Sequence, residues 1–461
     1  MFFEEIVKHL GFRPTVEQSE AITTFCRFMD SLAPNVSMIL CGSAGTGKTT
    51  LAAAIVRALN AQHRKICLLA PTGRAAKVFS SYSGKSASTI HRQIYRQKNV
   101  GGLTPRFQLN YNRQSNTLFI VDEASMIGAE LLSDLIRYIY HSATNCRLLL
   151  IGDFAQLPPV GEVESPALST EVLSSFSLVL FRSTLSEVLR QAYNSGILYN
   201  ATLVRNIVNY NTTTRLPIIQ FKGFPDIRSV PGDELIEQLS QSYSSVGVDE
   251  TMVITRSNRR ANIFNNGIRN QVLFYEEELS QGDMLIVVKN NYYWSEYLRL
   301  PLSFIANGDR LLVRRVYNTQ ELFGFRFTDL LVEMPDYENI SPFRITAICN
   351  SLSSESPSLT EEESATLYAN VLEDYLQIHS RVARIKAIRN DPHYNALQIK
   401  YAYAITCHKA QGGQWSHVYV DQGFLTAEMI NSDYIHWLYT AFTRATDKLY
   451  LVNWPKNQTS P

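Results

Sequence analysis

The sequence predicts an α/β fold with two parallel-sheet domains, a small insertion in the first domain and a β-barrel insertion in the second. Apolar runs alternate with helical patterns at both ends of the chain, which favours parallel strands joined by helices. Between them lies a β-rich stretch punctuated by Asn-Gly and Pro. A length of 461 residues, with 45% hydrophobic and 18% charged residues, suits roughly two to four globular domains.

The first domain is predicted to span residues 1–180. Its apolar runs, each followed by a helical pattern or a turn, are NVSMILCG, RKICLLAPT, TLFIVDEAS and CRLLLIGD. We expect these runs to be buried strands of one parallel sheet. A basic segment at about residues 92–115 interrupts the pattern, and we interpret it as the small insertion.

The second α/β domain is predicted from two separate segments, residues 181–274 and 395–461. The first contains the helical pattern SGILYNATLVRNIVNY and the strand MVIT, and the second contains QIKYAYAIT, SHVYV and KLYLV. Residues 275–394 begin with β-rich runs such as DMLIVVKNNYYW and RLLVRRVY. We interpret them as an inserted β-barrel followed by a helical segment, in which Thr360 and Glu363 have capping-box spacing.

Composition disfavours several classes of protein. No window contains the roughly 18 unbroken apolar residues of a membrane span, and Glu4 and Glu5 stand where a signal peptide would be basic. We therefore expect a cytoplasmic protein that does not bind membranes. Six cysteines lie far apart with no C-x-x-C pair, so we expect reduced, mostly buried thiols rather than a zinc site or a disulfide framework.

Charge is distributed unevenly along the chain, although the net charge is only +1. Residues 31–121 contain twelve Lys or Arg and no Asp or Glu. A solvated surface usually mixes both signs, so a one-signed block of this length favours a polyanionic partner. Phosphate, free or polymeric, is the expected ligand.

The most specific motif is GSAGTGKT, which fits G-x-x-x-x-G-K-[ST] between a predicted strand and a predicted helix. In that context backbone N–H groups cradle phosphates, Lys48 reaches the β- and γ-phosphates, and Thr49 ligates Mg²⁺. The alternative is a Gly-rich turn that binds nothing, which the flanking strand and helix disfavour. We therefore expect ATP and Mg²⁺ as cofactors, held by Gly42, Ser43, Ala44, Gly45, Thr46, Gly47, Lys48, Thr49 and Thr50.

Two acids follow the predicted strand TLFIV. Asp122 is expected to hold Mg²⁺ together with Thr49, and Glu123 is expected to orient the attacking water. Adjacent acids at the end of a strand are often only solvated. A phosphate-binding loop in the same domain makes the catalytic interpretation the stronger one.

A Gln follows the strand CRLLLI, in GDFAQLPPV. Asp153 and Gln156 are expected at the carboxyl edge of the same sheet, where ligands of α/β proteins bind. A Gln there can hydrogen-bond a γ-phosphate and release it after hydrolysis, and the Pro158-Pro159 turn offers a stiff connection to another surface. The alternative, a polar turn residue, has about equal weight on this stretch alone.

In order along nearly the whole chain, these motifs resemble those of superfamily 1 helicases of the 5′-to-3′ group, and they are most similar to the RecD- and Dda-like enzymes. The stretches that carry the resemblance are PTVEQSEAI, GSAGTGKT, APTGRAA, STIH, VDEAS, GDFAQLPPVG, LSEVLRQ, CHKAQGGQW and YTAFTRAT. The resemblance implies two RecA-like domains with ATP bound between them, and it makes Gln18 the residue that reads adenine.

The resemblance also implies an arginine pair for the γ-phosphate. Arg190 in LSEVLRQ and Arg444 in AFTRAT would reach it from the second domain, where a guanidinium stabilises the charge of phosphoryl transfer. Without the surrounding motifs, an ordinary surface ion pair would be the preferred interpretation of Arg190.

The residues that the resemblance assigns to single-stranded DNA are Thr72, His91, Thr406, His408 and Gln411. For His91, a structural role is the main alternative. The inserted barrel would be SH3-like, and residues 92–115 would carry a strand-separating pin with Phe107 near its tip. A basic surface loop with Phe107 in the core is an equal alternative, and core packing is at least as good an explanation of Tyr292, Tyr293 and Trp294 as base stacking.

The function expected from these observations is an ATP-dependent DNA helicase that moves 5′ to 3′ on single-stranded DNA, opens forked duplexes and works as a monomer. One alternative is a nucleic-acid-stimulated NTPase that clamps or remodels without unwinding. Another is a P-loop phosphotransferase, which needs neither a polyanion groove nor arginines from a second domain. Larger RecD-like enzymes have an N-terminal extension, which we do not expect here, nor partners that dock on one.

Overall fold

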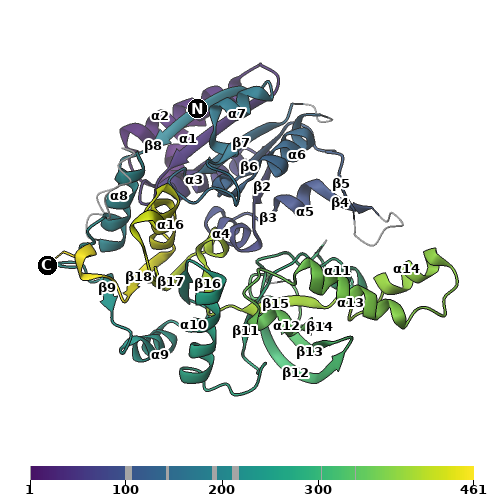
Figure 1. The fold of residues 1–461 in the computed structure, drawn as a ribbon. Coiled ribbons are helices and arrows are strands. Elements are labelled where there is room, and N and C mark those ends of the chain that lie inside the picture. Colours follow the sequence, from purple (N-terminus) through teal and green to yellow (C-terminus); the bar gives the residue numbers. More distant parts are fainter. Residues whose placement is uncertain are drawn as a thin grey trace.

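The computed structural model describes residues 2–98, 106–141, 145–188, 195–209, 217–302, 304–337 and 339–460. Within these residues the chain forms two parallel sheets, a closed barrel and a two-stranded ribbon (Figure 1). This confirms the predicted fold class. No helix in these ranges is long and apolar enough to cross a membrane.

The first sheet has six parallel strands in the order β3-β2-β6-β7-β1-β8. In that order their bounds are Ala87–Thr89, Lys65–Ala70, Thr117–Val121, Arg147–Gly152, Val36–Gly42 and Val179–Leu185. The sheet therefore continues to Leu185, five residues beyond the predicted boundary at 180. Strand β8 pairs with β1, although the two strands are far apart in the chain. The sequence pattern alone does not specify that pairing.

Helices cover both faces of the first sheet, and the residues of β1 alternate between them. Met38 and Leu40 pack with the helices α1 (Phe2–Leu10), α2 (Val16–Asp30) and α3 (Lys48–Ala61). Ile39 and Cys41 face the other core, which includes α6 (Ala129–Tyr140). Burial on both faces explains why the strand is apolar throughout.

The insertion in the first domain follows the short helix α5 (Ile90–Ile94). Strands β4 (Tyr95–Lys98) and β5 (Arg106–Leu109) pair antiparallel and project from the domain (Figure 1). These two antiparallel strands form a hairpin within the insertion expected at about residues 92–115. Residues 99–105, which join the two strands, lie outside the described residues.

The second sheet has five parallel strands in the order β16-β10-β17-β18-β9. In that order their bounds are Ala404–Thr406, Thr251–Thr255, Trp415–Asp421, Ala445–Val452 and Ile227–Val230. Four helices of this domain are α8 (Gly196–Asn209), α9 (Leu235–Ser245), α10 (Asn258–Gln271) and α16 (Ser432–Phe442). The second half of α16 is buried from Trp437 to Phe442, which fixes this helix between the two domains.

The inserted barrel closes through β11-β12-β13-β14-β15. In that order the strands are Met284–Val287, Arg310–Leu322, Phe325–Glu333, Phe343–Ile348 and Leu397–Tyr401. The helical segment between the last two strands includes α12 (Asn350–Ser353), α13 (Glu361–Glu373) and α14 (Arg381–Arg389). The capping box at Thr360 and Glu363 is present as predicted.

The structure corrects the boundary between barrel and second sheet. The run QIKYAYAIT was assigned to the second domain, but its first part, β15, closes the barrel, and only β16 joins the second sheet. The Asn265 amide stabilises the point where the chain passes from one sheet to the other. Its oxygen accepts from Tyr403 N (3.0 Å) and Ala404 N (2.8 Å). Its nitrogen donates to Tyr401 O (3.3 Å) and Ala404 O (2.9 Å). One buried side chain thus satisfies the backbone where the chain changes sheets.

Candidate nucleotide and nucleic-acid site

The phosphate-binding loop joins the end of β1 to the first turn of α3. Gly45 and Gly47 have φ of +79° and +77°, a left-handed conformation that side chains disfavour. Lys48, Thr49 and Thr50 then form the first turn of α3, with Thr49 and Thr50 exposed. The loop has the strand, turn and helix context that the motif requires.

Gln18 supports this loop from the second helix and is fully buried. Its amide nitrogen donates to Thr46 O (3.3 Å), and its amide oxygen accepts from Thr15 N (3.2 Å) in the capping box of α2. Gln18 therefore ties the start of α2 to the phosphate-binding loop. Its assignment to adenine stays a prediction.

The two acids after β6 lie beside the loop. Asp122 accepts from Glu123 N (2.9 Å) and from the Tyr82 hydroxyl. Burial and the neighbouring Glu123 raise the pKa of Asp122, and the nearby Lys48 opposes that rise. A half-buried carboxylate with a second acid beside it and one cation close by suits a divalent metal ion. Asp122 and the exposed Thr49 hydroxyl are thus chemically suited to Mg²⁺.

Gln156 lies between charged groups of both domains and is 5% exposed. When its amide nitrogen faces Glu123, it donates to Glu123 Oε2 (3.2 Å) and accepts from Arg444 Nη2 (3.3 Å). Arg444 Nη1 lies 3.8 Å from Glu123 Oε1. The structure therefore brings together three of the predicted site residues, one of them from the second domain.

Backbone carbonyls and a hydroxyl hold Arg444 in place. Its guanidinium donates to Thr440 O (3.1 Å), Gly413 O (3.2 Å) and Thr443 Oγ1 (3.2 Å), and the residue is 2% exposed. These bonds fix the direction of the guanidinium and leave its charge for Glu123 or a ligand.

Two residues that sequence reasoning missed also contact the phosphate-binding loop. Tyr439, in α16, accepts from Ala44 N (3.0 Å) and donates to Asp153 Oδ2 (2.6 Å). Arg205, in α8, donates through Nη1 to the Ser43 hydroxyl. Arg205 is the one charged residue in the α8 sequence GILYNATLVRNIVN, and that isolation is a signal that could have singled it out.

The loop around Gln156 is bonded to the second domain on both sides of that residue. Ala155 O pairs with His436 Nδ1 (2.9 Å), and Leu157 N donates to Thr440 Oγ1 (2.8 Å). Leu157 O accepts from Gln411 Nε2 (2.6 Å). Gln411 was predicted to grip DNA. In the structure its amide is instead buried against this loop, because the loop's backbone needs a donor there.

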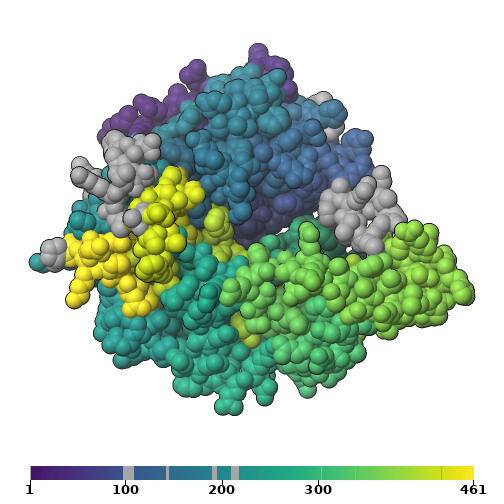
Figure 2. Space-filling view, in the orientation of Figure 1, coloured from purple at the N-terminus to yellow at the C-terminus, as the bar shows by residue number. Residues whose placement is uncertain are grey.

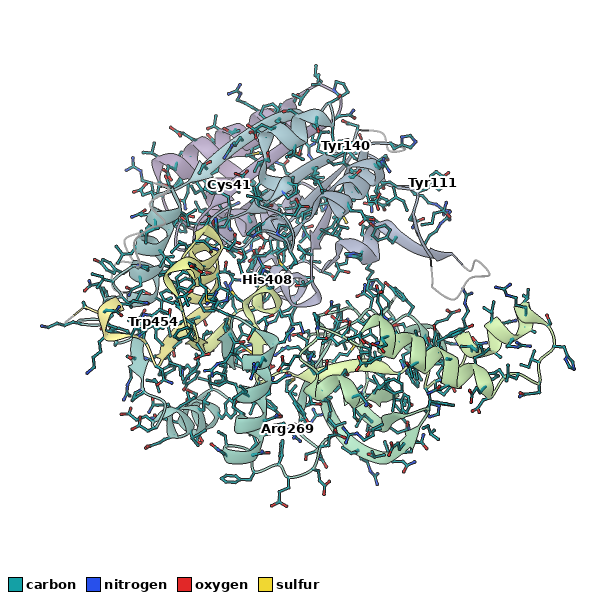
Figure 3. The ribbon with its side chains drawn as sticks, viewed as in Figure 1. Cys41, Tyr111, Tyr140, Arg269, His408 and Trp454 are labelled. Carbon is teal, nitrogen blue, oxygen red and sulfur yellow. The ribbon has the colours of Figure 1, made fainter. Side chains whose placement is uncertain are left out.

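The other predicted DNA-binding residues lie where the first domain meets the second sheet and the barrel. Thr72 caps α4 (Gly73–Ser83) by accepting from Ala75 N (3.2 Å). Gly412 has φ of +71°, and a Cβ on it would lie 2.8 Å from Ala75 Cβ and 3.2 Å from Thr72 Oγ1. Only glycine permits this approach of the two domains. His408 is exposed on α15 (Cys407–Ala410), which follows Thr406, at the junction that Figure 3 shows.

His91 packs at the base of the hairpin. Its ring centroid lies 5.5 Å from that of Tyr95 and 6.4 Å from that of Phe304, and burial lowers the pKa of His91. Trp294 is buried, and its Nε1 donates to Asn395 O (3.0 Å), so this ring belongs to the packing of the insertion. Arg190 and the side chain of Phe107 lie outside the described residues.

Some basic residues of the acid-free block hold domains together. Arg74 lies 3.6 Å from Asp336 of the barrel domain and 4.6 Å from the Trp415 ring centroid. Lys77 Nζ donates to Pro335 O (2.7 Å). Figure 2 shows the surface hollowed along the seam between the first domain and the barrel. The α4 helix lies on this seam, at the point where three parts of the chain meet.

Comparison with known proteins supports the assignment of both sheets. A family model described as an AAA domain matches residues 27–162, within the first domain. A second model, described as a UvrD-like helicase C-terminal domain, matches residues 401–452, within the second sheet and α16.

The relatives include two named helicases. The ATP-dependent RecD2 DNA helicase of Deinococcus radiodurans is 29% identical over 317 residues, which cover 66% of this chain and 41% of that protein. The ATP-dependent DNA helicase dda of Enterobacteria phage T4 is 28% identical over 294 residues, which cover 59% of this chain and 61% of that protein. The chain therefore spans less than two thirds of the length of either relative.

Among solved structures, the Pif1 helicase from Bacteroides in complex with ADP-AlF3 and ssDNA aligns with a TM-score of 0.47 at 17% identity, over 98% of this chain and 95% of that one. The two family models match in order on the two parallel sheets, and the chain is similar over part of its length to the RecD2 and Dda helicases.

Proposed function

We propose that the chain is an ATP-dependent DNA helicase that moves 5′ to 3′ along single-stranded DNA and opens duplex DNA at a fork. The observation that carries this proposal is the meeting of Arg444 from the second domain with Glu123 and Gln156 beside the phosphate-binding loop. An ATP site completed by a second domain can convert hydrolysis into relative domain movement.

In the proposed reaction, Lys48 and the backbone of the phosphate-binding loop hold the nucleotide phosphates. Asp122 and Thr49 would hold Mg²⁺, which would neutralise part of the phosphate charge. Glu123 orients the attacking water and takes its proton, and Arg444 stabilises the charge that develops on the γ-phosphate. Arg190 is proposed as a second arginine for the same phosphate.

The loop from Asp153 to Val160 is the proposed link between hydrolysis and DNA. Gln156 would sense the γ-phosphate, and its neighbours Ala155 and Leu157 are bonded to residues of the second domain. A change at Gln156 would therefore shift the second domain relative to the first. The proposed ligands of the strand itself are Thr72, His91, Thr406 and His408, whose hydroxyls and rings contact phosphates without reading sequence.

The proposed partners are single-stranded DNA and forked duplexes, with a monomer as the active form and the cytoplasm as its location. A clamp that hydrolyses ATP without unwinding would share every ATP residue. A phosphotransferase would have no use for Arg444 reaching across from the second sheet, which makes it the weaker alternative.

The test is ATP hydrolysis with and without single-stranded DNA, followed by unwinding of a forked duplex. We expect DNA to stimulate hydrolysis and the fork to be unwound. Glu123→Gln should slow both by about 10²-fold or more while ATP still binds, because the substitution removes a base and no phosphate contact. Hydrolysis that ignores DNA would favour the phosphotransferase, and stimulated hydrolysis without unwinding would favour the clamp.

A further inference from the structure

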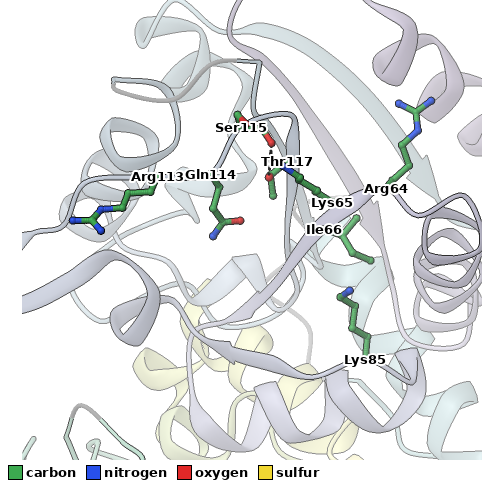
Figure 4. A pocket seen from close by; sticks show the side chains of 8 residues that line it. All are labelled: Arg64, Lys65, Ile66, Lys85, Arg113, Gln114, Ser115 and Thr117. Carbon is green, nitrogen blue, oxygen red and sulfur yellow. Dashed lines mark hydrogen bonds between the residues drawn. The ribbon is translucent and has the colours of Figure 1, made fainter.

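A basic cavity of about 520 Å³ lies on the first domain, away from the nucleotide site (Figure 4). Its lining residues are Arg64, Lys65, Ile66, Lys85, Arg113, Gln114, Ser115 and Thr117. Lys65 and Thr117 are the first residues of β2 and β6, whereas the predicted ATP and DNA residues follow the last residues of these strands. The cavity therefore lies at the amino edge of the sheet, opposite the nucleotide site.

The charge of this cavity has one sign. Its four basic residues belong to the acid-free block, and no carboxylate lines it. Within the described part of the chain, none of the four forms an ion pair, and the Lys85 Nζ bond runs to the neutral Asn60 Oδ1 (3.3 Å). Figure 4 shows Lys85 and Gln114 pointing into the space, and Arg64 and Arg113 on opposite sides of it with their guanidinium groups directed outward. Cations held around one space without acids create a positive potential that attracts an anion.

The cavity continues into a second one, which makes a groove. The second cavity, of about 160 Å³, shares Arg64, Lys65 and Thr117 with the first. It adds Met29, Asn116, Leu118, Asn145 and Arg147, and the Arg147 guanidinium donates to the backbone oxygens of Met29 and Ser31. Two adjoining cavities lined by cations, amides and hydroxyls, with a few apolar residues, suit a chain of phosphates better than one small anion, because the polar groups contact a nucleic-acid backbone without reading its sequence.

The groove is connected to the hairpin by a short stretch of chain. Strand β5 ends at Leu109, and Asn110 N is tied to Ile94 O (2.7 Å) at the hairpin base. The Arg96 guanidinium lies 5.9 Å from the Tyr111 ring centroid, and Arg113 follows two residues later at the groove. A basic path thus leads from the hairpin to the amino edge of the sheet.

The strand on which the protein moves does not explain this groove. That strand is assigned to residues after the carboxyl ends of the strands. The length of β6, five residues at about 3.3 Å each, separates the two edges by roughly 16 Å. A single track of phosphates along one edge therefore leaves the cations of the other edge without a ligand.

We propose that this amino-edge groove binds the sugar-phosphate backbone of the displaced strand after it separates from the duplex at the hairpin. The proposal rests on the proposed helicase function. It assigns Arg64, Lys65, Lys85 and Arg113 to a second nucleic-acid site, and it gives the displaced strand a path that keeps it from reannealing.

The test compares two DNA substrates in binding and unwinding: a duplex with a 5′ oligothymidine tail, and the same duplex with a 3′ oligothymidine tail added to the displaced strand. The test variant carries Arg64→Gln, Lys65→Gln, Lys85→Gln and Arg113→Gln. A matched control carries Lys8→Gln, Arg27→Gln, Lys222→Gln and Lys456→Gln, four exposed residues outside the groove with the same total change in charge.

We expect the parent to bind the two-tailed fork several-fold more tightly than the one-tailed duplex, and the test variant to bind both equally. The log–log salt slope of fork binding should fall in magnitude by about 3 in the test variant, at roughly 0.7 per lost contact to a single strand. ATP hydrolysis stimulated by single-stranded DNA should stay at the parental rate in both variants.

An unchanged fork preference in the test variant overturns the proposal, as does an equal loss in the control. Binding of polyglutamate that disappears in the test variant, with fork preference intact, would assign the groove to an acidic protein segment and also overturn it. If the parent protein hydrolyses ATP in response to DNA but shows no preference for the two-tailed fork, only the proposal that the groove binds the displaced strand is refuted. A parent with neither property refutes the helicase function as well.

Discussion

Gln156 contacts a carboxylate of the first domain and a guanidinium of the second, so its effect should be on coupling rather than on binding. In Gln156→Ala we expect ATP and single-stranded DNA each to bind nearly as in the parent. The change in DNA affinity caused by a non-hydrolysable ATP analogue should shrink, from a typical coupling of about 1–3 kcal/mol toward zero. Fluorescence anisotropy of labelled DNA, with and without the analogue, measures this. Gln62→Ala, an exposed glutamine at the end of α3, is the control. A parental coupling energy in Gln156→Ala would remove this residue from the mechanism.

Arg205 makes a second prediction at this scale, because its guanidinium reaches Ser43 of the phosphate-binding loop from α8. Arg205→Gln should raise the KM for ATP by about 10- to 100-fold, the range expected when one hydrogen bond to a charged group is lost. The kcat should fall less, since Arg444 remains in place. Steady-state kinetics measure both values, and thermal unfolding checks that the fold is intact. The control is Arg228→Gln, an exposed arginine paired with Glu234. A KM equal to that of the parent would mean that Arg205 contacts the loop without serving the nucleotide.

Single residues were predictable where a motif fixes their neighbours. Lys48, Asp122 and Glu123 follow strands whose apolar runs are plain in the sequence, and the structure places them at one edge of one sheet. Gln411 and Tyr439 were not predictable in the same way. Their contacts, with Leu157 and with Ala44, join positions far apart in the chain, and local pattern contains no information on such pairs.

At the scale of elements, the run from Leu397 to Thr406 shows what the local sequence pattern could not predict, which is its division between the barrel and the second sheet. It contains no Gly or Pro that would divide it, so it was assigned whole to the second domain. Its division depends on Asn265, whose amide bonds the backbone at the break, and on the pairing of Leu285 with Tyr401 in the barrel. The helix α13 shows the opposite case, because the local Thr360–Glu363 capping box was enough to set its start.

The contact between α4 and the barrel contains a buried carboxyl that should respond to pH. Asp309 accepts from Ala306 N (2.7 Å) and the Tyr337 hydroxyl (3.0 Å), and a Cβ on Gly73 would lie 2.7 Å from it. Burial raises the pKa of Asp309 to about 7, and the nearby Asp336 adds to the rise. The charged groups around Asp336 are Arg74, Lys77 and Arg310.

The sign of the effect follows from proton linkage. The folded state binds the Asp309 proton more tightly than the unfolded state, so this group lowers stability as pH rises from about 4 to about 7. Asp309→Asn should remove that loss, which is at most about 4 kcal/mol above pH 8. The amide oxygen can still accept from Ala306 N while the amide nitrogen faces the Tyr337 hydroxyl. Chemical denaturation of parent and variant at pH 5 and pH 8 measures the free energy of unfolding and its change with pH. Asp329→Asn, on the barrel surface, is the control. Equal pH dependence in parent and Asp309→Asn would contradict the prediction.

At the scale of the whole molecule, alternation of strands and helices predicted two parallel-sheet domains with two insertions, and the structure confirms this. The relative placement of the domains depends on long-range contacts that the alternation does not encode. Helix α16 is the clearest example, since it belongs to the second domain by chain order and bonds to the first domain through His436, Tyr439 and Thr440. In this arrangement the phosphate-binding loop is already closed by protein groups.

The Tyr439 hydroxyl occupies one of the loop N–H groups that a phosphate would use, so nucleotide binding and this contact compete. Tyr439→Phe removes the bond to Ala44 N (3.0 Å) and leaves Asp153 without the hydroxyl that donates to it (2.6 Å). We expect the nucleotide-free variant to be less stable by about 1–3 kcal/mol, the cost of an unsatisfied buried acceptor. We also expect it to bind a non-hydrolysable ATP analogue about 2- to 10-fold more tightly, because one net hydrogen bond no longer opposes binding.

Thermal unfolding and calorimetric titration with the analogue test both expectations on the intact chain. Tyr434→Phe is the matched control, since Tyr434 is buried in the same helix and donates to Gln422 Oε1 (2.7 Å), within the second domain. It should lose stability without a gain in nucleotide affinity. Weaker or unchanged nucleotide binding in Tyr439→Phe would show that the phenol stays on the loop when ATP is bound. The closure of the two domains would then be a feature of the ATP-bound state as well, and opening would have to follow hydrolysis through Gln156 and Arg444 instead.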